Sequence, residues 1–206
     1  MRLVVAILAV MAVAVPFDRP AADHPRIAYP ESYRGSFLPY AVRARPDLDQ
    51  VRHLFANPLA VDAIRNGEPL PHGAMFVAEI YATRKDAEGK PVRRADGRHE
   101  AGEVLFLAVM QSGPGWGQRH PREIRNGDWN FAAFDPATGM LDATRAEATC
   151  LECHRPMTQT QFVFSYDALV ARVRALPRDE AEPASIADGA DTGACPWSTP
   201  RTPPRG

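Results

Sequence analysis

Lysine is nearly absent from this sequence: only Lys85 and Lys90 stand among its 24 basic residues. Acidic residues number 25, so the formal net charge is −1. A nucleic-acid-binding surface and a polybasic membrane anchor both need a strong excess of basic residues, and the near balance of charge excludes them. The sequence also contains no internal repeat and no low-complexity stretch.

Long hydrophobic runs are confined to the N-terminus. Thirteen apolar residues, Leu3 to Val15, follow Met1-Arg2, and this run is shorter than the about 20 residues that span a membrane. Ala12-Val13-Ala14 fits the small-residue pattern of a cleavage site, so we interpret residues 1–22 as a signal peptide. An uncleaved N-terminal anchor is the alternative. Because no second hydrophobic run exists, we expect an exported, soluble protein without membrane contact after signal cleavage.

The length of the chain suits one domain, and 45% apolar residues suffice for a core. We place this domain at residues 28–176. Residues 177–206 contain six prolines and three glycines and are interpreted as a flexible tail, which includes Cys195.

Five segments rich in β-forming residues predict strands at 37–44, 51–55, 74–84, 104–111 and 129–134, with a long polar loop between the third and fourth. Asn57-Pro58 has the pattern of a helix start and Gly67 that of a helix end. A second helix with one apolar face is predicted at 166–176. The predicted fold class is therefore α+β, an antiparallel β-sheet with a few flanking helices in a single domain.

The most informative motif is Cys150-Leu151-Glu152-Cys153-His154. The pattern C-x-x-C-H is the attachment signature of a c-type haem. The two cysteine sulfurs add to the vinyl groups of the haem, and the histidine that follows becomes an axial ligand of the iron. The motif therefore predicts one covalent haem c, held by Cys150 and Cys153, with His154 on the metal.

The two cysteines have three other interpretations. A disulfide oxidoreductase also uses C-x-x-C, but within a βαβ unit near the start of the chain. A structural zinc site needs four ligands, and Cys195 is the one further cysteine. A structural disulfide between Cys150 and Cys153 is the third alternative.

The segments NPLAVDAIRNGEPLPHGAMFVAEIY, GDWNFAAFDPATG and CLECHRPM followed by FVFS resemble the cytochrome P-460 family, which includes the cytochromes c′-beta. The similarity covers about residues 29–170. Many cytochromes share the cysteine motif, whereas the order of the strand segments around it is much more specific. The resemblance implies a β-rich, dimeric, periplasmic protein with one pentacoordinate haem c. It also implies an open distal face for small nitrogen oxides, nitric oxide or hydroxylamine, and a periplasmic electron-transfer partner.

The same resemblance assigns roles to individual residues. Cys150, Cys153 and His154 match the haem-binding residues of the family. Arg52 falls where the family has an arginine in the distal pocket, which implies that it steers an anion or donates a hydrogen bond to a bound nitrogen oxide. A surface salt bridge is the alternative for Arg52.

Ala78 stands where the hydroxylamine-oxidising members carry a lysine that is cross-linked to the haem. A methyl group cannot form that bond, and Lys85 and Lys90 lie in the polar loop beyond the strand. We therefore expect an unmodified haem c, as in the cytochromes c′-beta. Strand alternation places Phe76 on the face of Ala78, where its ring would cap the distal side of the haem; ordinary core packing is the alternative.

Two functions stay open from the sequence. The first is a haem protein that binds or converts nitrogen oxides, and an oxidoreductase acting on nitrogen compounds is compatible with it. The second is an electron-transfer cytochrome with a six-coordinate haem, which needs another axial ligand. The sequence offers candidates that we treat as surface or core residues: His53, His72, His99, His120, Met75, Met110, Met140 and Met157.

Overall fold

The computed structural model describes residues 27–177 and 187–188. The predicted signal peptide at 1–22 and most of the predicted tail, Cys195 included, lie outside the described residues. In chain order the elements are α1 (Tyr33–Ser36), β1 (Leu38–Arg45), η1 (Pro46–Leu48), β2 (Gln50–Ala56), α2 (Pro58–Asn66), β3 (Met75–Thr83), β4 (Ala101–Ser112), η2 (Trp116–Arg119), β5 (Trp129–Phe134), α3 (Glu147–His154), η3 (Thr158–Thr160), α4 (Tyr166–Arg174) and β6 (Ala187–Asp188).

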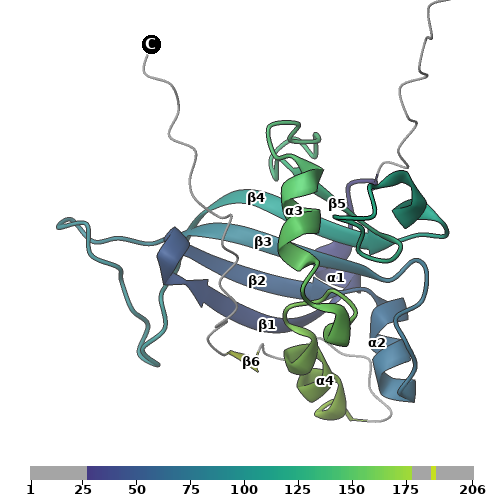
Figure 1. Ribbon diagram of the computed structural model, residues 1–206. Helices are drawn as coiled ribbons and strands as arrows, with labels where there is room; N and C mark the ends of the chain where they lie inside the picture. The colour runs from purple at the N-terminus through teal and green to yellow at the C-terminus, as the bar shows by residue number, and fades with distance from the viewer. Residues whose placement is uncertain (1–26, 178–186, 189–206) are drawn as a thin grey trace, which may run out of the picture.

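One sheet runs through the molecule in the strand order β5-β4-β3-β2-β1-β6 (Figure 1). Strands β1 to β5 pair antiparallel with their neighbours in the chain, whereas β6 pairs parallel with β1. Helix α3 lies across the sheet, with α4 near β1 (Figure 1). The fold is a single α+β domain, so the predicted fold class is confirmed. In the part of the chain that the structure describes, no helix has the length and apolar character needed to cross a bilayer.

Strand alternation divides the core into two layers, one on each face of the sheet. We call the face covered by α2, α3 and α4 the helical face and the opposite face the back face. The helical face buries side chains such as Phe76, Met110, Phe131, Leu151 and Leu169. The back face buries Tyr33, Phe55, Val77, Leu107 and Phe134. The prediction that Phe76 and Ala78 share a face is confirmed, since both lie on the helical face.

Helix α2 forms where the sequence predicts it, because both ends are capped. The Asn57 side-chain oxygen accepts a hydrogen bond from the backbone N–H of Ala60 at 3.1 Å. Pro58 occupies the first helical position, where the missing N–H costs nothing. Gly67 ends the helix with φ 71°, a left-handed conformation that glycine adopts without a Cβ clash.

Other boundaries differ from the predictions. Strand β4 begins at Ala101 rather than at residue 104, because Ala101 still pairs with Thr83 across the sheet. Helix α4 ends at Arg174 rather than at residue 176. Helices α1 and α3 were not predicted, and neither has a side-chain hydrogen bond at its N-cap.

Candidate haem-binding site

The cysteine motif occupies the C-terminal part of α3. Leu151, between the two cysteines, is almost completely buried against the helical face. Its carbonyl accepts a hydrogen bond at 2.9 Å from the side-chain amide of Asn126, a residue that is itself fully buried. Asn126 lies three residues before β5, so the segment that leads into this strand fixes α3 above the sheet.

His154 at the end of α3 has a defined orientation. Its Nδ1 lies 2.7 Å from the backbone carbonyl oxygen of Phe162. Because a carbonyl can only accept, Nδ1 is the protonated nitrogen and the lone pair is on Nε2. The rings of Phe131 and Phe164 flank the imidazole, with centroids at 4.7 and 4.9 Å. Histidines that bind metals typically have this arrangement, in which a hydrogen bond at one nitrogen directs the other nitrogen to the metal.

A strained stretch of backbone presents the Phe162 carbonyl. Gln161 and Phe162 both adopt positive φ, at 52° and 67°, which is uncommon for residues with a Cβ. Three hydrogen bonds hold them. Phe162 N–H donates to the Met157 carbonyl at 2.7 Å, Gln161 N–H donates to the Thr158 carbonyl at 3.2 Å, and Leu70 N–H donates to the Gln161 side-chain oxygen at 2.8 Å. Strain of this kind persists where surrounding contacts enforce it, often at functional sites.

The two motif cysteines differ in state. Cys150 has a free, half-buried thiol, and burial together with the Glu147 carboxylate raises its pKa to about 11. The first cysteine of a disulfide oxidoreductase needs a lowered pKa, so this finding argues against that alternative. Cys153 is disulfide-bonded, and because Cys150 is free, the two are not bonded to each other.

The zinc alternative finds no support in the described part of the chain. Among those residues, no group of three or more His, Cys, Asp and Glu side chains is placed to hold a metal ion. A structural zinc site needs four such ligands.

A cross-strand row of four alanines and one leucine lies on the helical face. Ala41, Leu54, Ala78, Ala108 and Ala133 are directly opposite one another across strands β1 to β5. Ala78 on β3 and Ala108 on the neighbouring strand β4 are partly exposed. Longer side chains there would fill the space above the sheet. The short alanine side chains beside α3 therefore fit a flat cofactor that is attached through the cysteine motif.

Arg52 and Phe76 both point to the helical face. Arg52 pairs with Ile80 in the register and lies one row beyond Ala78, where its guanidinium donates to the Gln50 side chain at 3.3 Å. Phe76 is 4% exposed and packs against Tyr40 and Trp129, with ring centroids at 6.4 and 5.9 Å. The site thus brings Arg52, Phe76 and Ala78 onto the sheet face over which the motif helix lies.

The candidate second axial ligands are scattered. His53 and Met75 lie on the back face, Met140 is exposed, His72 contacts Ser112, and His120 contacts Asn130. Among the candidates on strands, Met110 lies on the helical face, and it is buried in the core there. Met157 follows three residues after His154, too close to reach the opposite side of a haem.

Sequence comparison agrees with this geometry. A family model described as Cytochrome P460 matches residues 30–165, which is more than half of the chain. No curated protein matches the chain. The family implies a haem cofactor. The residues suited to hold one are the motif cysteines, the oriented histidine and the cross-strand row of alanines. The chain belongs to the cytochrome P460 family.

Proposed function

We propose that this protein is an exported, periplasmic c-type cytochrome with one covalent haem, which binds or converts small nitrogen oxides at an open distal face. The observation that carries the proposal is the 2.7 Å hydrogen bond from His154 Nδ1 to the Phe162 carbonyl. It directs Nε2 toward a metal in a residue that follows two cysteines with haem-attachment spacing. When bound, haem c would supply an iron that takes a diatomic ligand and exchanges an electron.

Each residue of the candidate site would have its own role. Cys150 and Cys153 would hold the cofactor covalently, and His154 would be its axial ligand. Arg52 would donate a hydrogen bond to a bound nitrogen oxide or steer an anion toward it, because a guanidinium is always charged and carries several donors. Phe76 would exclude water from the same face with its ring.

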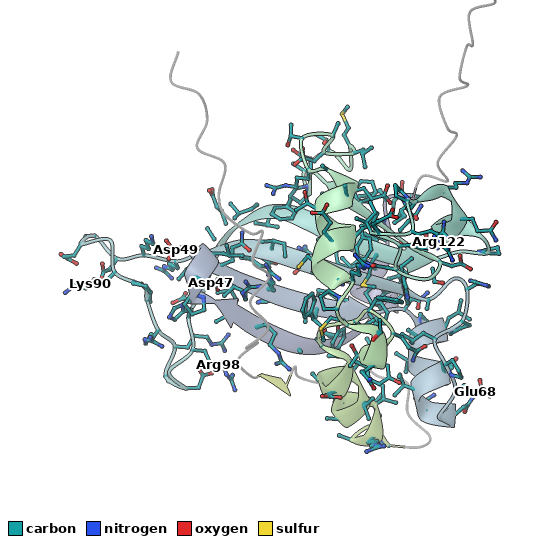
Figure 2. All side chains as sticks on the ribbon, in the orientation of Figure 1. Asp47, Asp49, Glu68, Lys90, Arg98 and Arg122 are labelled. Atoms are coloured by element: carbon teal, nitrogen blue, oxygen red, sulfur yellow. The ribbon has the colours of Figure 1, made fainter. Side chains whose placement is uncertain are left out.

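We propose further that the haem carries no lysine cross-link. Ala78 occupies the strand position that would have to supply the lysine. The Lys85 ammonium lies 2.6 Å from the Asp49 carboxylate, and Lys90 lies in the loop between β3 and β4, away from α3 (Figure 2). Hydroxylamine turnover should therefore be weak, while nitric oxide binding persists.

An optical spectrum of the reduced protein, recorded before and after nitric oxide, tests this function. Expressed with a cytochrome c maturation system, the protein should show an ordinary Soret band typical of high-spin, five-coordinate iron. That band should change when nitric oxide is added. A red-shifted ferrous band of a cross-linked haem would contradict the assignment of Ala78.

The competing function is electron transfer by a six-coordinate haem. Met110 is the strand candidate that shares the helical face with Ala78. A low-spin ferrous spectrum without response to nitric oxide would favour this function, most clearly if Met110→Leu converted it to high spin. With five-coordinate iron, Met110→Leu should leave the ferrous spectrum unchanged. The dimer and the periplasmic electron-transfer partner stay predictions. Light scattering after size-exclusion chromatography would measure the oligomeric state and so test the dimer.

A further inference from the structure

The loop between β3 and β4 carries a cluster of basic residues that the haem site does not use. Its tip folds into a tight hairpin, in which Arg94 N–H donates to the Arg98 carbonyl at 2.8 Å and Gly97 adopts φ 82°. A bridge between Arg93 and His99 continues the pairing. Figure 2 shows Arg98 on the far side of the molecule from α2 and α4, at the end of the sheet. The cluster is therefore separate from the candidate haem site.

This hairpin encloses a pocket of about 250 Å³ against the sheet. The loop side and the start of β4 contribute Arg94, Arg98, His99, Glu100 and Ala101, and the sheet contributes Val42, Val51 and His53. Val51 and His53 alternate with Arg52 along β2, so the pocket opens on the back face. We call it the hairpin pocket.

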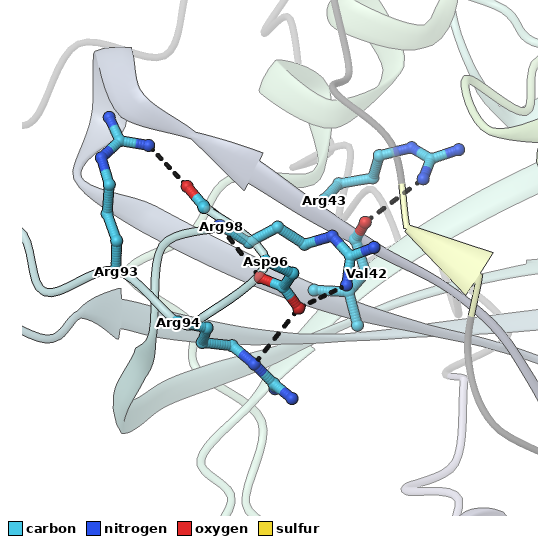
Figure 3. Close-up of polar contacts among 7 residues, drawn as sticks. Val42, Arg43, Arg93, Arg94, Asp96 and Arg98 are labelled. Carbon is cyan, nitrogen blue, oxygen red and sulfur yellow. Dashed lines mark hydrogen bonds and ion pairs between the residues drawn. The ribbon is translucent and has the colours of Figure 1, made fainter.

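Positive charge exceeds negative charge around the hairpin pocket. The Asp96 carboxylate forms ion pairs with two arginines, Arg98 at 2.9 Å and Arg94 at 3.7 Å (Figure 3). The Glu100 carboxylate is bonded to Arg84 at 2.6 Å. Among the lining residues, the guanidiniums of Arg94 and Arg98 thus stand against one carboxylate, that of Glu100, which is already paired with Arg84.

The two histidines of the wall add hydrogen-bonding capacity. His99 is 9% exposed, and its Nδ1 has no hydrogen-bond partner in the described part of the chain. A buried polar atom without a partner is destabilising, so a bound acceptor would relieve it. Burial lowers the pKa of His53; the Glu79 charge opposes the shift, and Arg94 adds to it. His53 is then neutral at pH 7 and can still donate through one ring nitrogen.

We propose that the hairpin pocket binds a small inorganic oxyanion. Guanidinium groups bind two oxygens of such an anion with two parallel hydrogen bonds, a geometric match that a single-atom anion such as chloride lacks. The volume holds an anion of a few atoms, since one water occupies about 30 Å³ of liquid. Val42 and Val51 form the apolar part of the wall.

Titration of the full, haem-loaded protein with inorganic phosphate, by calorimetry at constant ionic strength, tests the proposal. We expect saturable binding of one phosphate per chain. The double substitution Arg94→Gln and Arg98→Gln should weaken it at least tenfold. Sodium chloride in place of phosphate should give no saturable signal.

Arg93→Gln is the control, because it removes one positive charge from the same hairpin. The Arg93 guanidinium donates to the Gly97 carbonyl at 2.7 Å and does not line the pocket (Figure 3). Its phosphate affinity should stay within twofold of that of the wild type. An equal loss in Arg93→Gln, or no saturable binding by the wild type, would overturn the proposal.

Nuclear magnetic resonance of the wild type decides the question if the double variant does not fold. Phosphate should shift the imidazole resonances of His53 and His99 with the same dissociation constant. His72, which contacts Ser112 at the other end of β3, should not respond. Unshifted His53 and His99 resonances would overturn the proposal. Since the measurement does not depend on the haem ligands, its failure leaves the proposed function untouched.

Discussion

His154 and Phe162 are joined by a hydrogen bond of 2.7 Å between the imidazole Nδ1 and a backbone carbonyl. This contact fixes both the tautomer and the orientation of the histidine before any metal is bound. A ligand that is already oriented loses less freedom when it binds iron.

Gln161 should act as a positioning residue for His154. Its side-chain oxygen accepts from Leu70 N–H at 2.8 Å and so holds the strained backbone that presents the Phe162 carbonyl. Gln161→Met keeps the size but removes the acceptor, which should lower the free energy of unfolding by about 1 kcal/mol. Resonance Raman of the ferrous protein should show a shifted iron–histidine stretching frequency. The exposed neighbour Gln159, changed to Met, should leave this frequency in place, and an unchanged frequency in Gln161→Met would remove Gln161 from the site.

Ala78→Leu should reduce haem incorporation by at least about threefold, because the longer side chain fills the space above the alanine row. Haem absorbance relative to total protein measures the occupancy, and circular dichroism checks that the chain is folded. Ala82→Leu is the control, since Ala82 lies on the same strand and face but pairs with Gln50 beyond the Arg52 row. Full haem occupancy in Ala78→Leu would show that the cofactor does not lie over this row.

Arg52→Gln should keep the haem and weaken nitric oxide binding about tenfold, the equivalent of one lost hydrogen bond. Stopped-flow absorbance gives the association and dissociation rates. Arg65→Gln, on the exposed side of α2, should change neither rate. Identical rates in Arg52→Gln and the wild type would assign Arg52 to the surface instead.

Glu79 should make the protein sensitive to acid. Its buried carboxylate accepts hydrogen bonds from Tyr33 at 2.5 Å, Arg34 at 2.6 Å and Tyr81 at 2.7 Å. Burial alone would raise the pKa of Glu79, but these bonds outweigh it and hold the pKa below 4.5. The folded state therefore binds fewer protons than the unfolded state, and its stability falls as the pH drops below about 4.5.

Glu79→Gln removes this dependence. At pH 7 it should lower the free energy of unfolding by about 2 kcal/mol, because the amide offers one acceptor where the carboxylate offers two. Below pH 4.5 the stabilities of variant and wild type should converge in denaturant titrations. The exposed Glu68, changed to Gln, should not alter the profile. A constant difference between Glu79→Gln and the wild type at every pH would contradict the lowered pKa.

Capped and alternating segments could be predicted from the sequence. Strand β5 (Trp129–Phe134) has the predicted bounds, since a turn precedes it and its side chains alternate between two cores. Helix α3 could not be predicted, because its sequence has no apolar periodicity and Leu151 is its one buried residue. The helix depends on tertiary contacts, above all the bond from Asn126 to its backbone.

The candidate site was predictable only in part. Cysteine spacing identified Cys150, Cys153 and His154, because that chemistry requires a fixed separation. No sequence signal pointed to the Phe162 carbonyl, since the positive φ of Gln161 and Phe162 occurs in residues that rarely adopt it. The cross-strand row of alanines depends on the register, which single segments do not reveal.

The mass of the denatured, intact protein tests the central claim most directly. After expression with a cytochrome c maturation system, the chain should carry the added mass of one haem through denaturation. Cys150→Ser with Cys153→Ser, expressed in the same way, should have the mass of the chain alone. A wild-type mass without haem, from cells that mature other c-type cytochromes, would contradict the assignment of Cys150, Cys153 and His154 as the haem-binding residues.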